Sequence, residues 1–414
     1  MSNRVPEGWE ETKLGHVASL TMGQSPSSDT YNTEAVGLPF FQGKADFGSR
    51  SPKVRYWCSK PTKVADEGSI LFSVRAPVGE VNITPAACCI GRGLSGIKAA
   101  SADQEFLYQK LQYVKPLFAL LSQGSTFEAV NGGEMKEFPL TLPPLPEQKK
   151  IAAILSSVDE VIEKTRAQID KLKDLKTGMM QELLTKGIGL GGIPHTEFKD
   201  SPVGRIPLSW GVVPLINAVS KIVDCEHKTA PYVDSSEYLV VRTSNVRSGQ
   251  LIQEDMKFTT KDGFAQWTQR ALPTEGDVLF TREAPAGESC MVPTGLKVCM
   301  GQRMVLLRPN TENIYPYFFS LFLISEAAQQ AIYELSIGTT VSRINIEDIK
   351  RIPCLVPPLE EQVEIYNSVQ AVQSLITVKE QMLESTKSSK KALMQDLLTG
   401  KVRVNVEARE LADA

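Results

Sequence analysis

Leu142-Pro143-Pro144-Leu145-Pro146-Glu147-Gln148 is the stretch of sequence that decides the fold of this chain, because it marks the start of a long helix. A pair of prolines is excluded from a helix interior but tolerated at its beginning. Behind this stretch, mostly apolar residues recur at spacings of three and four: Ile151, Leu155, Val158, Ile162, Thr165, Ile169, Leu172, Leu175, Met179 and Leu183. The stripe predicts a helix of about 38 residues, well beyond the usual length of about 11–12, that packs on a second helix.

The proline motif and the stripe both return near the end of the chain. The second motif is Pro357-Pro358-Leu359-Glu360-Glu361-Gln362, and its stripe is Ile365, Val369, Val372, Ile376, Lys379, Leu383, Thr386, Leu393 and Leu397. The first helix leads the chain to the region that precedes the second motif. If the two helices pack along their lengths, the second must run back, so we expect a long antiparallel coiled coil.

The regions that precede the two helices share further motifs in the same order, which indicates an internal repeat. The matching pairs are Val5-Pro6 with Ile206-Pro207, Gly68-Ser69-Ile70-Leu71-Phe72 with Gly276-Asp277-Val278-Leu279-Phe280, Ala76-Pro77 with Ala284-Pro285, Gly91 with Gly301, and Gly124-Ser125-Thr126 with Gly338-Thr339-Thr340. The offset between matched residues grows through these regions and is constant through the helices, since loops accept insertions and a packed helix pair does not. We therefore expect two related domains and an approximate two-fold axis.

Short runs of strand type and helical stretches alternate in both regions, which predicts α+β domains. The strand-type runs include Gly68–Val74, Glu237–Arg242 and Lys297–Leu307, and the helical stretches are Asp103–Ser122 and Tyr315–Leu335. The predicted boundaries are 1–142 for the first domain, 143–186 for the central helix, 187–206 for a glycine-rich linker, 207–356 for the second domain, 357–400 for the distal helix and 401–414 for the C-terminal tail.

Composition limits the classes of function. The formal net charge is −3, so any nucleic-acid surface must be local. The 7 cysteines lack C-x-x-C spacing, which predicts idle or buried thiols in a reducing cytoplasm, without disulfides or a metal site. No apolar run approaches the roughly 18 residues of a membrane-spanning helix, and the N-terminus lacks the apolar segment of a secretory signal. We expect a cytoplasmic protein without membrane contact.

The sequence motifs of catalysis are missing. There is no phosphate-binding G-x-x-x-x-G-K-[ST] loop, no Asn/Asp-Pro-Pro-Tyr/Phe run of an amino-methyltransferase and no G-x-G-x-x-G after a predicted strand. None of the three histidines, His16, His195 and His227, lies near a hydrolase or metalloprotease motif. We therefore expect no catalytic residues, no cofactor and no enzymatic activity.

One basic segment stands out at residues 44–63, where six Lys or Arg residues accompany the single acid Asp46. A solvated loop would have a similar composition, and that interpretation stays open. Arg, Lys, Asn and Gln bind phosphates and base edges, and hydroxyl residues on glycine turns approach phosphates closely. The candidate contacts are Gln42, Lys44, Arg50, Arg75, Arg92 and Thr126 in the first region and Arg242, Asn245, Arg247, Arg282, Arg303, Thr340 and Arg343 in the second. A plain surface or structural role is the alternative for each.

Together, these motifs resemble those of the specificity subunit of type I restriction–modification enzymes. The resemblance covers essentially the whole chain and rests on the doubled motifs and on Ile151-Ala152, Ile154-Leu155, Val158-Asp159 and Ile162 after the first proline pair. It implies a non-catalytic protein with two target-recognition domains and two spacer helices, which binds an asymmetric bipartite target in double-stranded DNA. The implied partners are two methyltransferase (modification) subunits and restriction/translocase subunits. The second motif departs from the pattern, because Val363-Glu364-Ile365-Tyr366 lacks the alanine-rich turn.

Four apolar residues of the helices lie off the main stripe and form the predicted partner-binding surface: Ile154, Val161, Met180 and Leu184. Exposed apolar patches mark interaction sites, so we expect contact with the modification subunits. Burial against the chain's own domains is the alternative. Two other functions stay open, namely a coiled-coil scaffold that binds proteins and a recognition subunit of another multi-subunit DNA-modification system.

Overall fold

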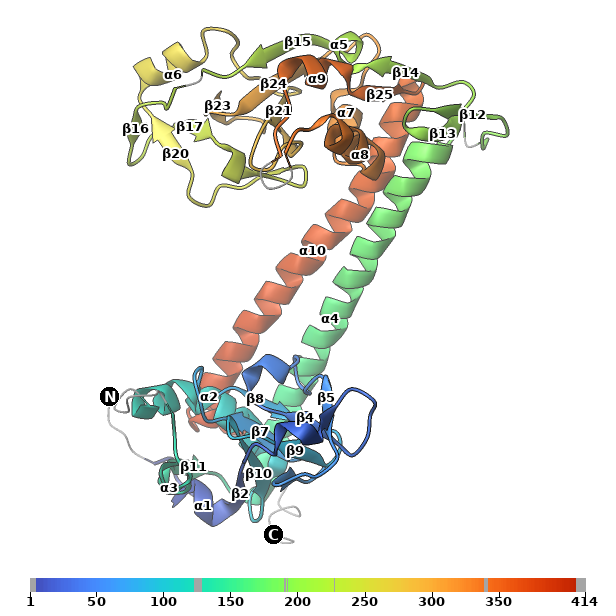
Figure 1. Cartoon of the computed structure of the whole chain (residues 1–414). Coiled ribbons are helices and arrows are strands. Elements are labelled where there is room, and N and C mark those ends of the chain that lie inside the picture. Colours follow the sequence, from blue (N-terminus) through green and yellow to red (C-terminus); the bar gives the residue numbers. More distant parts are fainter. Residues whose placement is uncertain are drawn as a thin grey trace. The chain divides into compact units, whose positions relative to one another are not determined.

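The computed structural model describes residues 5–122, 129–189, 191, 193–226, 228–338 and 342–406. The chain divides into two compact units, shown in Figure 1. Unit 1 comprises Met1–Ala167 and Glu380–Ala414, and unit 2 comprises Gln168–Lys379. The two long helices are α4 (Leu145–Lys186) and α10 (Leu359–Leu398). One part of each helix belongs to unit 1 and the other part to unit 2. Both begin directly after a proline pair, as the sequence predicts.

Unit 1 is built on two small sheets. The four-stranded antiparallel sheet has the order β2 (Ala18–Met22), β10 (Leu94–Ala99), β7 (Ile70–Ser73) and β8 (Val81–Ile83). The five-stranded sheet has the order β3 (Tyr31–Asn32), β5 (Tyr56–Cys58), β4 (Leu38–Phe41), β9 (Cys88–Ile90) and β6 (Val64–Ala65). Within it β4 and β9 run parallel, so the ends of both strands lie at the same edge of the sheet.

Shorter elements complete unit 1. Strand β1 (Glu10–Lys13) pairs antiparallel with β11 (Pro139–Leu142), which leads into α4. The helices are α1 (Leu14–Val17), α2 (Gln104–Ser122) and α3 (Gly132–Glu137), and 3-10 turns cover Ser28–Thr30 and Lys44–Asp46. The core joins β7, α2, the first turns of α4 and the last turns of α10, through residues such as Phe72, Phe118, Ile151 and Leu397.

Unit 2 contains equivalent sheets. Its four-stranded antiparallel sheet has the order β15 (Val219–Asp224), β24 (Met304–Pro309), β21 (Val278–Thr281) and β22 (Ser289–Met291). The mixed sheet has the order β16 (Tyr232–Val233), β20 (Lys257–Thr259), β17 (Tyr238–Val241) and β23 (Lys297–Met300), with β17 parallel to β23. The two-stranded pairs are β12 (Phe198–Ser201) with β13 (Gly204–Pro207), β14 (Gly211–Pro214) with β25 (Pro353–Val356), and β18 (Val246–Arg247) with β19 (Gln250–Leu251).

The helices of unit 2 are short apart from the parts of α4 and α10. They are α5 (Leu215–Ala218), α6 (Lys261–Trp267), α7 (Pro316–Leu323), α8 (Glu326–Leu335) and α9 (Ile346–Arg351), with a 3-10 turn at Thr243–Asn245. The prediction of one helical stretch at Tyr315–Leu335 is therefore wrong, because this segment forms the two helices α7 and α8. The helix ends at Leu323 and restarts because the Ser325 side chain caps α8, accepting a hydrogen bond from the Ala328 N–H at 3.3 Å. Lys297–Leu307 likewise forms two strands, with a turn at residues 301–303.

The glutamine of each proline motif ties the start of the long helix to its own unit. The Gln148 side chain accepts a hydrogen bond from the Asp103 N–H at 2.9 Å and donates to the Pro143 carbonyl at 2.8 Å. In unit 2, Gln362 accepts from the Tyr315 N–H and donates to the Pro357 carbonyl, both at 2.8 Å. The repeated motif thus carries the same structural role twice.

Within each unit the parts of α4 and α10 lie side by side (Figure 1). In unit 1, Asp159 on α4 pairs with Lys390 on α10 at 2.7 Å, and Ile151 and Leu155 share the core with Leu397. Residues nearer the start of α4 therefore contact residues nearer the end of α10. The two segments run antiparallel in unit 1. In unit 2, Lys176 donates to the Gln373 side chain at 2.7 Å. Of the helices in the described ranges, none combines the length and apolarity that crossing a bilayer requires.

Candidate nucleic-acid interface

Four loops of unit 1 are linked by a chain of backbone hydrogen bonds. Gly91 N–H donates to the Phe41 carbonyl at 2.8 Å, Val74 N–H to the Gly93 carbonyl at 3.0 Å, and Val130 N–H to the Val74 carbonyl at 2.9 Å. These bonds join the loop after β4, the turn after β9, the loop after β7 and the segment that leads to α3. We call residues 42–46, 74–79, 91–93 and 129–131 the four-loop edge of unit 1.

The same three bonds recur in unit 2. Gly301 N–H donates to the Val241 carbonyl at 2.8 Å, Arg282 N–H to the Arg303 carbonyl at 2.8 Å, and Ile344 N–H to the Arg282 carbonyl at 3.0 Å. Residues 242–245, 282–287, 301–303 and 342–344 form the four-loop edge of unit 2. The backbone framework of the two edges is therefore shared, whereas most of the side chains on it differ.

A buried side chain holds the first loop of each edge. The Asp46 carboxylate accepts from the Gln42 N–H at 2.7 Å and from Arg55 at 2.6 Å. The Asn245 side chain accepts from the Arg242 N–H at 3.2 Å and donates to the Ile252 carbonyl at 3.0 Å. Each loop is thus fixed by a side chain that reaches back to the end of the preceding strand, as in an Asx turn.

The second loop is closed by a hydroxyl in each unit. Ser73 Oγ donates to the Pro77 carbonyl at 2.7 Å and accepts from the Glu80 N–H at 2.9 Å. Thr281 Oγ1 makes the equivalent bonds to Pro285 at 2.6 Å and from Glu288 at 3.0 Å. Because both hydrogen-bonding functions of the hydroxyl are used, the loop is held close to the end of its strand.

Four predicted contacts of the first region lie on the edge of unit 1. Gln42, Lys44, Arg75 and Arg92 are all exposed there and come from three of the four loops. The third loop lies close to the first because Gly93 has no side chain. A Cβ at this position would lie 2.3 Å from the Gln42 carbonyl oxygen. The edge of unit 1 therefore brings cations together that are far apart in sequence.

Arg50 lies elsewhere and is occupied within the unit. Its guanidinium donates to both carboxylate oxygens of Glu105, at 3.0 and 2.5 Å, and lies 5.1 Å from the ring centroid of Tyr108. The hydrogen bonds that Arg50 donates to the Glu105 carboxylate raise the pKa of Arg50 above its ordinary value. A bidentate, partly buried pair of this kind anchors the segment to α2 and leaves little of the guanidinium for phosphate.

Unit 2 presents fewer of its predicted contacts. Arg303 and Arg343 lie exposed on its four-loop edge. Arg247 is also exposed, outside the edge, 3.9 Å from Glu288. These three arginines remain available to an anion such as a phosphate.

Three other predicted contacts of unit 2 are engaged internally. Asn245 is fully buried, against the expectation of a surface contact, because its amide closes the first loop. Arg282 is 15% exposed and pairs with Asp224 at 2.8 Å. Arg242 donates to the Asp255 carbonyl at 2.6 Å. Through these bonds the three side chains hold the loops of the edge in place. Thr126 and Thr340 lie outside the described residues.

The predicted partner-binding residues separate into buried and exposed positions. Leu184 is 4% exposed and belongs to the core of unit 2, where Met180 packs against it, and Ile154 packs against the core of unit 1. Leu184 is therefore buried within its own unit, and Met180 and Ile154 are partly buried there. Val161 is 42% exposed.

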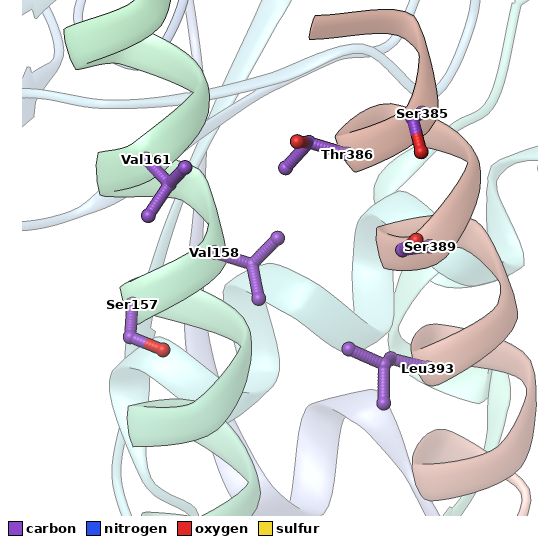
Figure 2. A pocket seen from close by; sticks show the side chains of 7 residues that line it. All are labelled: Ser157, Val158, Val161, Ser385, Thr386, Ser389 and Leu393. Carbon is purple, nitrogen blue, oxygen red and sulfur yellow. The ribbon is translucent and has the colours of Figure 1, made fainter. Parts of the chain in front are cut away.

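Val161 lines a groove between α4 and α10 of unit 1 (Figure 2). The groove has a volume of about 300 Å³ and is lined by Ser157, Val158, Val161, Ser385, Thr386, Ser389 and Leu393. It forms because α10 carries the short side chains of Ser385 and Ser389 where longer ones would fill the space between the helices. The polar Thr386, at a position of the predicted stripe, is the sequence signal for this weaker packing.

A second exposed stripe lies on α10 and escaped the sequence analysis. In unit 2, Leu375 and Val378 are 53% and 60% exposed, whereas Val372 and Ile376 on the same helix are buried. Their spacing of three residues could have indicated a second apolar face. The stripe through Val372 and Ile376 already explained the helix, so this second face was not predicted.

No group of His, Cys, Asp or Glu residues that could hold a metal ion occurs in the part of the chain that the structure describes. The seven cysteines are buried and free, as expected. Burial raises the pKa of the Cys88 thiol to about 11. A buried thiol with a raised pKa is a poor nucleophile.

The fold and its two edges define a class of protein: two α+β domains with one shared loop framework, connected through two long helices. The family model described as type I restriction modification DNA specificity domain matches residues 6–174 and 224–387, and the chain belongs to this family. The resemblance inferred from the proline motifs is thereby confirmed.

The relatives of this chain include proteins from Methanocaldococcus jannaschii. The putative type I restriction enzyme MjaX specificity subunit is 44% identical over 185 residues, a match that spans 44% of this chain and 44% of that relative. The type I restriction enzyme MjaVIII specificity subunit is 26% identical over 428 residues, which cover 97% of this chain and 94% of the relative.

Two solved structures share the fold. The S subunit of a type I restriction-modification system from M. genitalium has a TM-score of 0.58 at 14% identity and covers 98% of both chains. A chain from a structural study of complex assembly and conformational transition of the type I R-M system has a TM-score of 0.59 at 19% identity, over 96% of this chain and all of that one. At these identities the likeness concerns the fold alone.

Proposed function

We propose that this chain is the non-catalytic DNA-recognition subunit of a cytoplasmic type I restriction–modification complex, and that it binds an asymmetric bipartite target in double-stranded DNA. Residues 1–142 and 207–356 are the two target-recognition domains, and each contacts one half of the target through its four-loop edge. Residues 143–186 and 357–400 are the helices between the domains, and 187–206 and 401–414 are the linker and tail.

One observation carries this proposal: two loop frameworks with the same backbone hydrogen bonds carry different side chains. Unit 1 has Gln42, Lys44, Arg75 and Arg92 on its edge, and unit 2 has Arg303 and Arg343. Equal frameworks suit two successive stretches of one duplex, while different side chains suit two different base sequences. A symmetric binder would carry the same side chains on both edges.

The helices serve as the spacer in this proposal. The constant offset between the two helical segments supports matched lengths, as an antiparallel coiled coil with an approximate two-fold axis requires. The bases between the two half-sites would then remain unread.

The exposed apolar surfaces of the helices support binding of modification subunits, two per chain, with restriction/translocase subunits joining that complex. In unit 1 this surface is the groove at Val161, and in unit 2 it is the pair Leu375 and Val378. Neighbouring exposed apolar residues that form one contiguous patch mark protein interfaces.

Methylation mapping tests the proposal. Cells that express this chain with modification subunits should acquire methylation at one asymmetric, bipartite motif with a constant gap, and cells with the modification subunits alone should not. The purified single chain should show no S-adenosylmethionine-dependent methylation, nuclease or ATPase activity. A continuous or palindromic motif, or methylation by the single chain, would contradict the proposal.

A further inference from the structure

Arg303 occupies an unfavourable backbone position on the edge of unit 2. Its φ of 67° lies in the left-handed region, which residues with a Cβ adopt at an energetic cost. The equivalent residue of unit 1 is Gly93, so the framework accepts a glycine here. Strained non-glycine residues of this kind cluster at functional sites.

The side chain of Arg303 is held at one end only. Its Nε lies 3.2 Å from Glu283 Oε2, and the side chain is 55% exposed. Within the described ranges, no hydrogen bond engages its two terminal nitrogens. The neighbouring Arg282 differs, because its Nη1 is bound to Asp224. Glu283 therefore holds the Nε of Arg303, and the two terminal nitrogens of the guanidinium keep their donors for a ligand.

The two edges differ in the charge on the second loop and in the residue at the end of the third. Glu283 corresponds to Arg75 in unit 1, and both residues make an isolated β-bridge to the fourth loop, with Arg343 and Ala129 respectively. Arg303 corresponds to Gly93. Unit 1 therefore carries exposed arginines on its second and third loops, Arg75 and Arg92, whereas in unit 2 the third loop carries Arg303 and the second loop supplies an acid, Glu283.

We propose that Arg303 recognises a guanine in the half-site bound by unit 2, and that Glu283 is the residue that positions it. Guanine offers two acceptors, O6 and N7, in the major groove, and the terminal nitrogens of arginine fit both at once. Glu283 pairs with Nε, so the two terminal nitrogens have no hydrogen bond to the described residues, and the ion pair limits the conformations of the side chain. This inference rests on the proposed function.

Arg303→Gly is the decisive variant, because glycine relieves the backbone strain and is already tolerated at the matching position. Cells that carry the variant with modification subunits should show a motif in which one guanine of a single half-site is no longer required. The expected loss of discrimination at that position is about 10-fold to 100-fold, as for one bidentate arginine–base contact. Arg351→Ala, which removes an exposed arginine of α9 outside the edge, should leave the motif unchanged.

A binding measurement with the assembled complex tests the role of Glu283. The probe is a duplex with 7-deazaguanine at the identified position, which lacks the N7 acceptor. The wild type should bind it about 10-fold more weakly than the natural duplex, and R303G should bind both equally. Glu283→Gln should bind the natural duplex more weakly and still prefer it to the 7-deazaguanine duplex.

The outcomes separate the two proposals. An unchanged motif for R303G, or equal binding of both duplexes by the wild type, would overturn the role of Arg303 while the proposed function stands. A wild-type chain that directs no bipartite methylation would overturn the proposed function and this inference with it. If R303G directs no methylation at all although it unfolds at or above the wild-type temperature, Arg303→Gln decides: the glutamine variant should methylate without requiring the guanine, because an amide fits adenine instead, and strict retention of the guanine would contradict the proposal.

Discussion

The carboxylate of Glu361, buried at the start of α10, accepts a hydrogen bond of 2.8 Å from the indole Nε1 of Trp210. The same carboxylate accepts from the N–H groups of Ile188 and Gly189 and lies 2.9 Å from His195 Nε2. It therefore ties the chain that leaves α4 to the tryptophan that opens the second α+β region. Four partners on one buried carboxylate make it the central polar contact of this part of unit 2.

Removing this carboxylate should destabilise unit 2. Glu361→Ala leaves the buried Trp210 Nε1 and two backbone N–H groups without an acceptor, and we expect a loss of about 3 kcal/mol or more in the free energy of unfolding. Glu361→Gln keeps one acceptor and should lose less. Chemical denaturation followed by tryptophan fluorescence measures both, and equal stability of the alanine variant and the wild type would refute the role of Glu361.

The same carboxylate predicts a loss of stability in acid. Burial alone would raise the pKa of Glu361, but hydrogen bonds from Gly189, His195 and Trp210 lower it below its ordinary 4.5. A lowered folded-state pKa contributes stability that is complete above pH 4.5 and is lost as the pH falls through the folded-state value. Melting temperatures between pH 7 and pH 3 should fall more steeply for the wild type than for Glu361→Gln. Parallel curves would show that Glu361 does not cause the acid dependence.

In unit 1 the first proline motif holds the C-terminal segment. Arg403 donates to both carboxylate oxygens of the buried Glu147, at 2.7 and 2.8 Å, and to the Glu7 carbonyl at 2.6 Å. Arg403→Ala leaves the Glu147 charge without its partner, and we expect a loss of about 2 kcal/mol in the stability of unit 1. The exposed Arg166→Ala is the matched control and should change stability little, since its ion pair with Glu163 is at the surface. The rate of proteolysis of the N-terminal region measures this loss of stability, and it should be higher for Arg403→Ala than for Arg166→Ala.

Two glutamate substitutions on α4 should act differently. Leu184→Glu places a charge in the core of unit 2 and should unfold it, at a cost of about 3 kcal/mol or more. Val161→Glu lies at the groove and should leave folding unchanged while it weakens co-purification with modification subunits. Circular dichroism and size-exclusion chromatography distinguish the two effects. Normal complex formation by V161E would exclude the groove as a binding surface.

Lengthening both helices tests the spacer. Four residues inserted after Lys171 and four after Val378 add about one turn, roughly 6 Å, to each helix and keep their lengths matched. At about 3.4 Å per base pair this corresponds to one or two base pairs. The insertions avoid Leu184, whose burial excludes an insertion near the end of α4. Methylation mapping should find a gap lengthened by one or two base pairs with both half-sites unchanged, whereas an altered half-site would argue against the helices as the spacer.

Local chemistry explains why the sequence predicts so much of this fold. Prolines limit where a helix begins, a spacing of three and four defines one face of it, and both signals occur twice. The break between α7 and α8 was not predicted, because residues that favour a helix continue on both sides of it and the Ser325 cap is a single short signal.

The repeat, the two long helices and the family can all be inferred from the sequence, because they depend on neighbouring residues and on motifs that recur in order. Which polar residues face outward became known from the three-dimensional structure. Arg50 is occupied by Glu105, Arg282 by Asp224 and Glu147 by Arg403, partners that lie 55, 58 and 256 positions away along the chain. A side chain's freedom to bind DNA depends on such distant partners, which no local pattern contains.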